Sequence, residues 1–119
     1  MVAAELIVVA PDVAFRHSLV FILESAGFRV VSHGSLVSAF ASLQARHVQC
    51  AVVDEEAVDD WLSARRLFSS FARPVILLVD RFREMPETPI IRYLAKPFLG
   101  EPLVDAVQEA IGWISDPDT

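Results

Sequence analysis

The feature that most limits the possible folds is a regular alternation of short apolar runs with amphipathic stretches. Five runs rich in Val, Ile and Leu occur at residues 6–10, 28–31, 50–53, 75–79 and 90–95. Such runs are typical of strands that are buried on both faces of a sheet. Because they alternate with helical patterns, the sequence predicts parallel strands joined by right-handed crossovers. The expected fold is an α/β doubly wound sheet of five parallel strands, with helices on both faces.

Four stretches between and after these runs have the apolar spacing of amphipathic helices. The first begins after Asp12, a residue type suited to an N-cap, and ends at Gly27, which suits a C-terminal cap. The second follows Ser35, another suitable N-cap. The apolar residues expected to contribute to the core are Phe15, Leu19, Ile22, Leu23 and Ala26, then Leu36, Ala39, Phe40 and Leu43, then Leu62, Leu67, Phe68 and Phe71, and finally Leu103, Val107, Ala110, Ile111 and Ile114.

The composition fits one compact domain spanning residues 1–119. Hydrophobic residues make up 54% of the chain and charged residues 22%, which is enough for a core without disulfides. The single cysteine, Cys50, lies in the run "CAVV" and is expected to be a small buried hydrophobe. The net charge of −6 argues against direct binding to nucleic acid. No secretory signal or membrane span is recognisable, so we expect a cytoplasmic protein.

In a doubly wound sheet, the working site lies at the carboxyl ends of the strands, near the point where strand order reverses. The residues at the predicted strand ends are Ala10-Pro11-Asp12, Asp54, Val79-Asp80 and Lys96. On this set, the chain resembles the receiver domain of bacterial two-component response regulators over nearly its full length. "LIVVAPDVAFRHSLVFILESAGFRV" resembles the first strand, helix and second strand of the nitrogen-fixation-regulator branch. "AVVD" resembles the third strand with its phosphoacceptor, and "RYLAKPF" the fifth strand with its Lys-Pro. The resemblance implies a flavodoxin-like receiver fold.

The resemblance also assigns roles to single residues. Asp54 falls on the phosphoacceptor, Lys96 on the phosphate-binding lysine and Tyr93 on the aromatic switch position. A receiver further needs two carboxylates to hold Mg²⁺ and a hydroxyl to hold the phosphoryl oxygens. The acidic pair is expected at Ala10 and Pro11, and the hydroxyl at Val79.

None of these three replacements can do its expected task, so the resemblance is to an atypical, degenerate receiver. We therefore expect no Mg²⁺ binding and no other cofactor. Asp54 is expected to be vestigial or structural, with an ion pair to Lys96 as the remnant of the site. Asp12 is expected to cap the first helix, with a second interpretation in which it turns inward.

The acids after Asp54 have two interpretations. Glu55, Glu56, Asp59 and Asp60 could replace the missing metal ligands. The interpretation we favour is that they complement the dipole of the following helix and stay solvated.

The segment between Val79 and Lys96 is too short for a full fourth receiver helix, and Pro86 and Pro89 disfavour one. That helix is expected to be shortened or missing, which would uncover the fifth strand and the last helix. Exposed strand edges and apolar patches are usually covered by a partner. The residues expected at such an interface are Ile91, Tyr93, Val104 and Trp113, with Val13, Val20 and Phe21 on the first helix as the next candidates.

Three hypotheses for function follow. The first is a non-enzymatic module in two-component signalling that binds a sensor histidine kinase, another signalling protein or a second copy, independently of phosphorylation. The second is a conventional receiver phosphorylated on Asp54 by a sensor kinase, or the regulatory domain of a longer transcription regulator. The third is an unrelated α/β enzyme, which the absence of a Gly-rich phosphate loop in the sequence disfavours.

Overall fold

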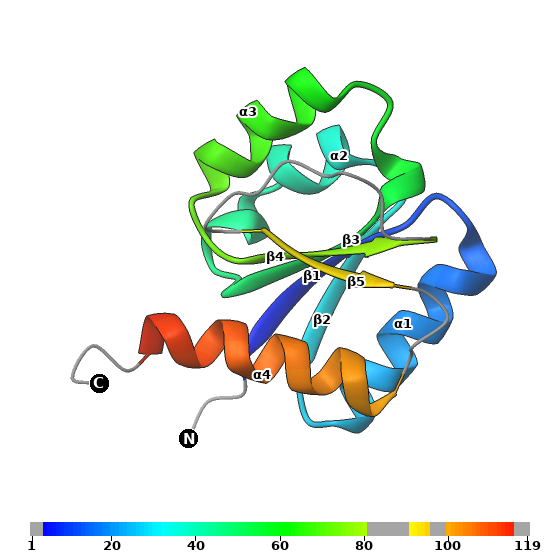
Figure 1. Ribbon diagram of the computed structural model, residues 1–119, viewed down its shortest axis with the longest axis vertical. Coiled ribbons are helices and arrows are strands. Elements are labelled where there is room, and N and C mark those ends of the chain that lie inside the picture. Colours follow the sequence, from blue (N-terminus) through cyan, green and yellow to red (C-terminus); the bar gives the residue numbers. More distant parts are fainter. Residues whose placement is uncertain (1–3, 81–90, 96–99, 116–119) are drawn as a thin grey trace.

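A parallel sheet of five strands lies between two layers of helices (Figure 1). This computed structural model describes residues 4–80, 91–95 and 100–115, without the side chains of residues 43, 44 and 113–115. The strand order is β2-β1-β3-β4-β5, and every neighbouring pair is parallel. The predicted doubly wound α/β fold is therefore confirmed. The strands are β1 (Glu5–Val9), β2 (Arg29–His33), β3 (Cys50–Asp54), β4 (Val75–Val79) and β5 (Ile91–Ala95).

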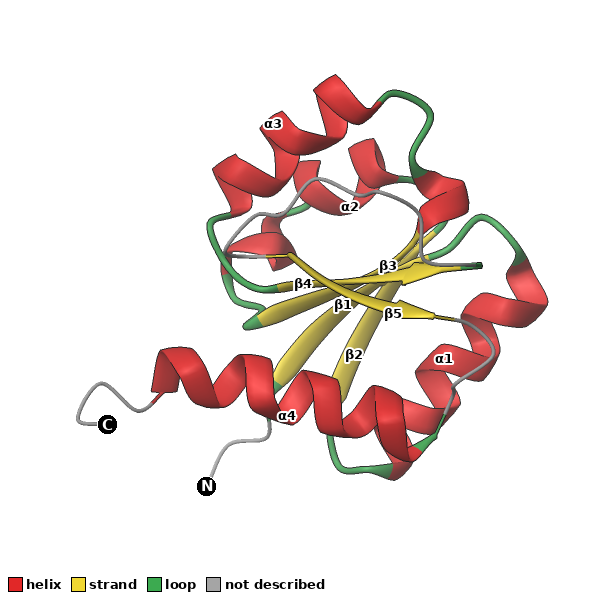
Figure 2. Cartoon of the chain, in the orientation of Figure 1, coloured by secondary structure: helices red, strands yellow, loops and turns green. Residues whose placement is uncertain are grey.

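The described helices divide between the two faces of the sheet. Helices α1 (Val13–Ser25) and α4 (Glu101–Ser115) cover one face, while α2 (Leu36–Ala41) and α3 (Trp61–Phe71) cover the other (Figure 2). Short 3-10 turns, η1 (Leu43–Arg46) and η2 (Glu55–Ala57), flank β3. The prediction of a shortened or missing helix between the fourth and fifth strands falls on residues 81–90, outside the described part. The fourth α-helix of the described chain is present as α4 and follows β5.

Strand alternation divides the core in two. On β1, Leu6 and Val8 pack with α1 and α4, whereas Ile7 and Val9 pack with α2 and α3. Successive strand side chains point to opposite faces, so one apolar run supplies both cores. This explains why the central strands are continuously hydrophobic instead of alternating with polar residues.

The predicted caps of the first two helices are confirmed. The Asp12 carboxylate accepts a hydrogen bond from the N–H of Phe15 at 2.8 Å, and the Ser35 hydroxyl oxygen accepts one from the N–H of Ser38 at 3.1 Å. Gly27 follows α1 with a φ of 100°, the left-handed conformation in which glycine ends a helix without strain.

Two helix predictions are wrong in detail. The helix expected after Ser35 ends at Ala41, because Ser42 has extended backbone angles (φ −73°, ψ 152°) and the chain continues as η1. Leu62 was expected to contribute to the core, yet 62% of its surface is exposed. The buried stripe of α3 runs through Ala64 and Phe68. Leu62 lies two residues before Ala64, about 200° around the helix from it.

Candidate functional site

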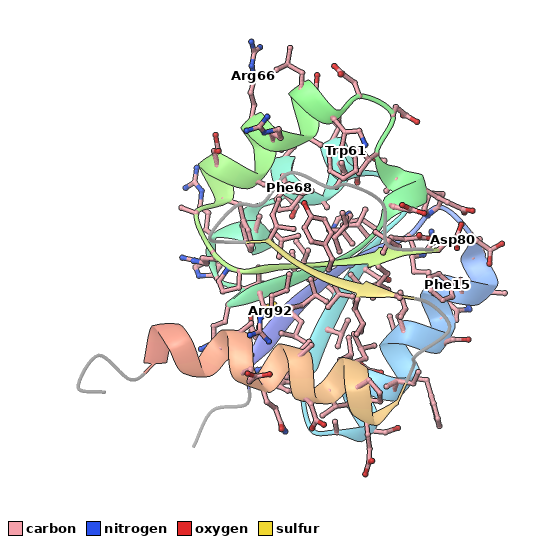
Figure 3. All side chains as sticks on the ribbon, in the orientation of Figure 1. Phe15, Trp61, Arg66, Phe68, Asp80 and Arg92 are labelled. Carbon is pink, nitrogen blue, oxygen red and sulfur yellow. The ribbon has the colours of Figure 1, made fainter. Side chains whose placement is uncertain are left out.

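The candidate site lies at the carboxyl edge of the sheet, where the chain order reverses between β1 and β3. The edge comprises the ends of β1, β3 and β4, which come from distant parts of the sequence (Figure 1). Figure 3 shows Asp80, the residue after β4, at this edge. Open α/β sheets place ligands at such a point because the loops on its two sides diverge.

Asp54 ends β3 at this edge, as the resemblance predicts for a phosphoacceptor. Only 1% of its surface is exposed. Its Oδ1 accepts a hydrogen bond from the N–H of Glu56 at 3.3 Å, so the side chain caps the turn η2. The carboxylate therefore has a structural task and offers almost no surface to an incoming phosphodonor.

Neither Ala10 nor Pro11, the positions expected for the acidic pair, offers a side chain to a metal ion. Ala10 is fully buried, and its N–H donates to the carbonyl oxygen of His33 at 3.1 Å. Pro11 is exposed, and Asp12 is occupied as the N-cap of α1. The interpretation in which Asp12 turns inward is thus wrong, because its carboxylate accepts the Phe15 N–H instead.

Arg16 was missed as a member of the site. Its side chain reaches back from α1, and Nη1 donates to the carbonyl oxygen of Ala10 at 2.8 Å. A Cβ atom on Gly34 would lie 3.1 Å from the same Nη1, so the glycine leaves room for the guanidinium. A cationic group therefore bridges the loops after β1 and β2. An arginine four residues after an N-cap, with a glycine after the next strand, is a weak sequence signal for this contact.

Glu55 departs from the expectation of a solvated acid. Its Oε1 accepts a hydrogen bond from the backbone N–H of Asp80 at 3.0 Å, which joins the ends of β3 and β4. Asp60 caps α3 by accepting from the Leu62 N–H at 3.1 Å and from the Ser63 hydroxyl at 2.8 Å. These bonds, the hydroxyl first, hold the pKa of Asp60 below its usual value.

The donor set does not fit the Mg²⁺ site of a receiver. The two expected ligand positions carry a methyl group and a proline ring, and the Ala10 carbonyl oxygen already accepts from Arg16. Within residues 4–80, 91–95 and 100–115, no three His, Cys, Asp or Glu side chains are grouped to hold a metal ion. The chemistry of phosphoryl transfer through a bound metal therefore has no support from these positions.

The remaining predicted site residues lie on β4 and β5. Val79 is fully buried and brings no hydroxyl to the site. Tyr93 is half-buried and packs against the core on the α2 and α3 face. Burial raises the pKa of its phenol, while the positive charge of Arg65 acts in the opposite direction. Lys96, and with it the predicted ion pair to Asp54, lies outside the described residues.

Of the four residues expected at the interface, Tyr93 and Val104 are described and partly exposed. Ile91 is 9% exposed and belongs to the core, so it is a poor interface candidate. Val104 on α4 is half-buried, and the side chain of Trp113 lies outside the described part. Arg92 on β5 binds Glu109 on α4, with Nη1 and Oε2 3.0 Å apart, so this edge is tied to the last helix (Figure 3).

The alternative interface surface on α1 is more open. Phe21 is 72% exposed and Val13 is 54% exposed, while Val20 is half-buried. Large apolar side chains as exposed as Phe21 are common singly on protein surfaces, so exposure by itself does not make this helix an interface.

No protein-family model matches the chain. It is 31% identical over 107 residues to the transcriptional regulator protein FixT of Rhizobium meliloti, covering 89% of this chain and 91% of FixT. Its fold is similar to a response regulator receiver protein from Sinorhizobium medicae, with a TM-score of 0.77, 18% identity and coverage of 92% and 95% of the two chains. A response regulator from Thermotoga maritima gives a TM-score of 0.76 at 21% identity, covering 93% of this chain and 99% of the other.

None of the helices in the described residues has the length and apolar character needed to cross a membrane.

Proposed function

The chain belongs to the response-regulator receiver family, in the branch that includes FixT, and we propose that in two-component signalling it acts as a protein-binding module without phosphorylation. The observation that carries this proposal is the hydrogen bond from Arg16 to the Ala10 carbonyl. The loop that holds a divalent ion in a conventional receiver is held here by a cation of the chain itself. This hydrogen bond supports a loop conformation that is maintained without a metal or a phosphoryl group.

The burial of Asp54 supports the same proposal. Phosphoryl transfer needs an accessible carboxylate and compensation of the charge on the transferred group, a term usually worth several kcal/mol. Asp54 is buried and bonded to the Glu56 N–H, and the residues at the metal positions bring no negative ligand. A protein built this way is expected to recognise its partner in one constant conformation, and to catalyse no reaction.

The partner we propose is a sensor histidine kinase or another signalling protein, with a second copy of the chain as the alternative. The surface proposed for this contact is the edge formed by β5 and α4, where Tyr93 and Val104 are half-buried. A half-buried aromatic ring on an edge strand and a half-buried aliphatic side chain on a helix can bury further apolar area on docking.

Phosphorylation of Asp54 tests the proposal directly. The purified chain is incubated with Mg²⁺ and acetyl phosphate, beside a conventional receiver as positive control, and the intact mass of each is measured. We expect an adduct on the control only. Calorimetric titration with Mg²⁺ is expected to give no saturable heat at about millimolar concentration.

The second candidate function is a conventional phosphoacceptor, which is favoured by the place of Asp54 at the carboxyl end of β3 beside the switch point. A phosphate adduct that disappears in the Asp54→Asn variant would establish this function and contradict the first proposal. The same variant, if it still captures the partner, separates loss of phosphorylation from loss of the fold.

A further inference from the structure

A groove of about 370 Å³ opens between α2 and α3, on the face of the sheet that does not carry α1 and α4. We call it the α2–α3 groove. Its lining includes Phe40 and Ser42 from the α2 side, Ser70 and Phe71 from α3, and the two cations Arg46 and Arg73. Because η1 precedes β3 and Arg73 precedes β4, the groove lies toward the amino edge of the sheet, opposite Asp54.

Part of the groove is lined by the segment where the second helix is interrupted. At Ser42 the backbone becomes extended, and the Ser42 hydroxyl donates to the carbonyl oxygen of Ala39 at 2.7 Å. Arg73 then holds the displaced turn, because its Nη1 donates to the carbonyl oxygens of Arg46, at 3.0 Å, and of Val48. These carbonyl groups lie at the end of η1 and beyond it, where a helix leaves its carbonyl groups without partners of its own.

The backbone of Ala72, at the end of α3, is in an unusual conformation. Ala72, between α3 and Arg73, has a φ of 58° and a ψ of 26°, the left-handed region that non-glycine residues seldom adopt. The turn at Ala72 is what directs Arg73 toward η1. Ala72 caps the C-terminus of α3 in this conformation, and its N–H donates to the carbonyl oxygen of Phe68 at 3.0 Å.

The groove combines an aromatic wall with positive charge. The Phe40 and Phe71 rings are tilted against each other with centroids 5.1 Å apart, and the Arg73 guanidinium lies 6.0 Å from the centroid of Phe71. The Arg46 side chain is exposed and makes no hydrogen bond or ion pair with the part of the chain that the structure describes. The lining therefore presents an apolar surface beside an available cation.

The distribution of charge sets the groove apart from the rest of the chain. The protein has a net charge of −6, yet no Asp or Glu occurs from residue 25 to 53 or from residue 61 to 79. These two segments supply α2, η1 and α3, and hence the whole lining of the groove. A positive surface of this kind on an acidic protein favours an anionic partner and repels a basic one.

We propose that the α2–α3 groove binds an acidic peptide segment of a partner protein. One apolar side chain of the peptide packs against Phe40 and Phe71, and a neighbouring carboxylate pairs with Arg46. The volume is at the lower end of the range for ligand pockets, roughly 300–1,000 Å³, which suits one or two side chains of a longer segment. This inference rests on the proposed function, because it takes the protein to be a binding module. It adds a second binding surface, which lies away from β5 and α4.

The test uses a fluorescein-labelled decapeptide that alternates Glu with Leu and Phe, and a matched peptide with Gln in place of Glu. Fluorescence anisotropy measures binding to the full chain, and amide chemical shifts map the contact. We expect the Glu peptide to shift Ser42, Ala45 and Ser70, and the Gln peptide to bind about tenfold more weakly, because a charge-assisted hydrogen bond is lost.

Two variants locate the contact, and one serves as control. Arg46→Ala removes the cation and is expected to weaken binding of the Glu peptide roughly tenfold. Ser70→Trp fills the groove from an exposed position of α3 and is expected to abolish binding. Arg66→Ala removes a cation from the same helix that points away from the sheet (Figure 3), and is expected to leave binding unchanged.

The proposal would be overturned if the Glu peptide did not bind at about 1 mM, or if the Arg46→Ala and Ser70→Trp variants bound it as tightly as the parent chain. Chemical-shift changes confined to β5 and α4 would also contradict it. Self-association that Ser70→Trp removes would assign the groove to a second copy instead. Phosphorylation of Asp54 does not enter this measurement, so failure here is distinct from failure of the proposed function.

Discussion

The Oε1 of Glu55 lies 3.0 Å from the backbone nitrogen of Asp80 and accepts its hydrogen bond. This contact fastens the end of β3 to the end of β4 at the edge where a conventional receiver performs its chemistry. Val79, the residue just before Asp80, brings no hydroxyl to this edge. An acid that could have served the missing metal site is thus committed to holding two strand ends together.

Replacing Glu55 tests this connection. Glu55→Ala is expected to lower the free energy of unfolding by about 1 kcal/mol, the usual net value of one hydrogen bond. Glu56→Ala is the matched control, because the exposed Glu56 side chain makes no such bond with the described part of the chain. Its free energy of unfolding is expected to stay within about 0.5 kcal/mol of the parent chain. Urea unfolding measures both. Equal effects of the two substitutions would contradict the assignment.

We expect substitutions of Arg16 and Gly34 to have coupled effects on the free energy of unfolding. Arg16→Ala leaves the buried Ala10 carbonyl without the guanidinium donor, and is expected to lower the free energy of unfolding by about 1–3 kcal/mol. Gly34→Ala places a Cβ 3.1 Å from Nη1 of Arg16, so it should destabilise the parent chain and do little in the Arg16→Ala background. A double-mutant cycle is expected to give an interaction energy of about 0.5 kcal/mol or more. Strictly additive effects would show that the two residues do not share this space.

Ala72→Gly is expected to stabilise the chain. Ala72 has a φ of 58°, where an alanine costs roughly 1 kcal/mol more than a glycine because of its Cβ. Ala26 also ends a helix but has a φ of −86°, so Ala26→Gly should bring no gain. Thermal unfolding of the two variants distinguishes the cases. A loss of stability in Ala72→Gly would mean that the strain is absent.

Cys50 is expected to be inert in the native chain. Its side chain is fully buried, and burial raises the pKa of the thiol from 9.0 to about 12, so almost no thiolate forms at neutral pH. Iodoacetamide should label Cys50 in urea but not in buffer. Rapid labelling of the folded protein would contradict its burial.

The same shift predicts how stability depends on pH. In the unfolded chain the thiol ionises near its ordinary pKa of 9.0, whereas in the folded chain it stays neutral up to about 12. The contribution of the neutral thiol is therefore fully present below pH 9.0 and is lost as pH rises toward about 12. Cys50→Ala should show a smaller decline over this interval than the parent chain in urea titrations.

The sequence by itself determined the features that depend on near neighbours. The caps at Asp12 and Ser35 join residues three positions apart, so local residue type was enough to predict them. The apolar runs predicted strands buried on both faces, and their alternation with helices predicted the parallel sheet. The resemblance placed Asp54 at the end of β3 in the same way, because the order of the elements fixes which residues follow each strand.

Only the tertiary structure decided how the strand ends and the groove are held. Glu55 reaches Asp80 across 25 positions, and Arg73 reaches Arg46 across 27, so neither bond leaves a pattern in the local sequence. The break at Ser42 goes against a helical pattern, and Arg73 donates to carbonyl oxygens of the segment that follows the break. Leu62 fits a helix stripe by type, yet the stripe that meets the sheet is set by how α3 packs. Local preferences amount to tenths of a kcal/mol per residue, so long-range contacts decide wherever the two conflict.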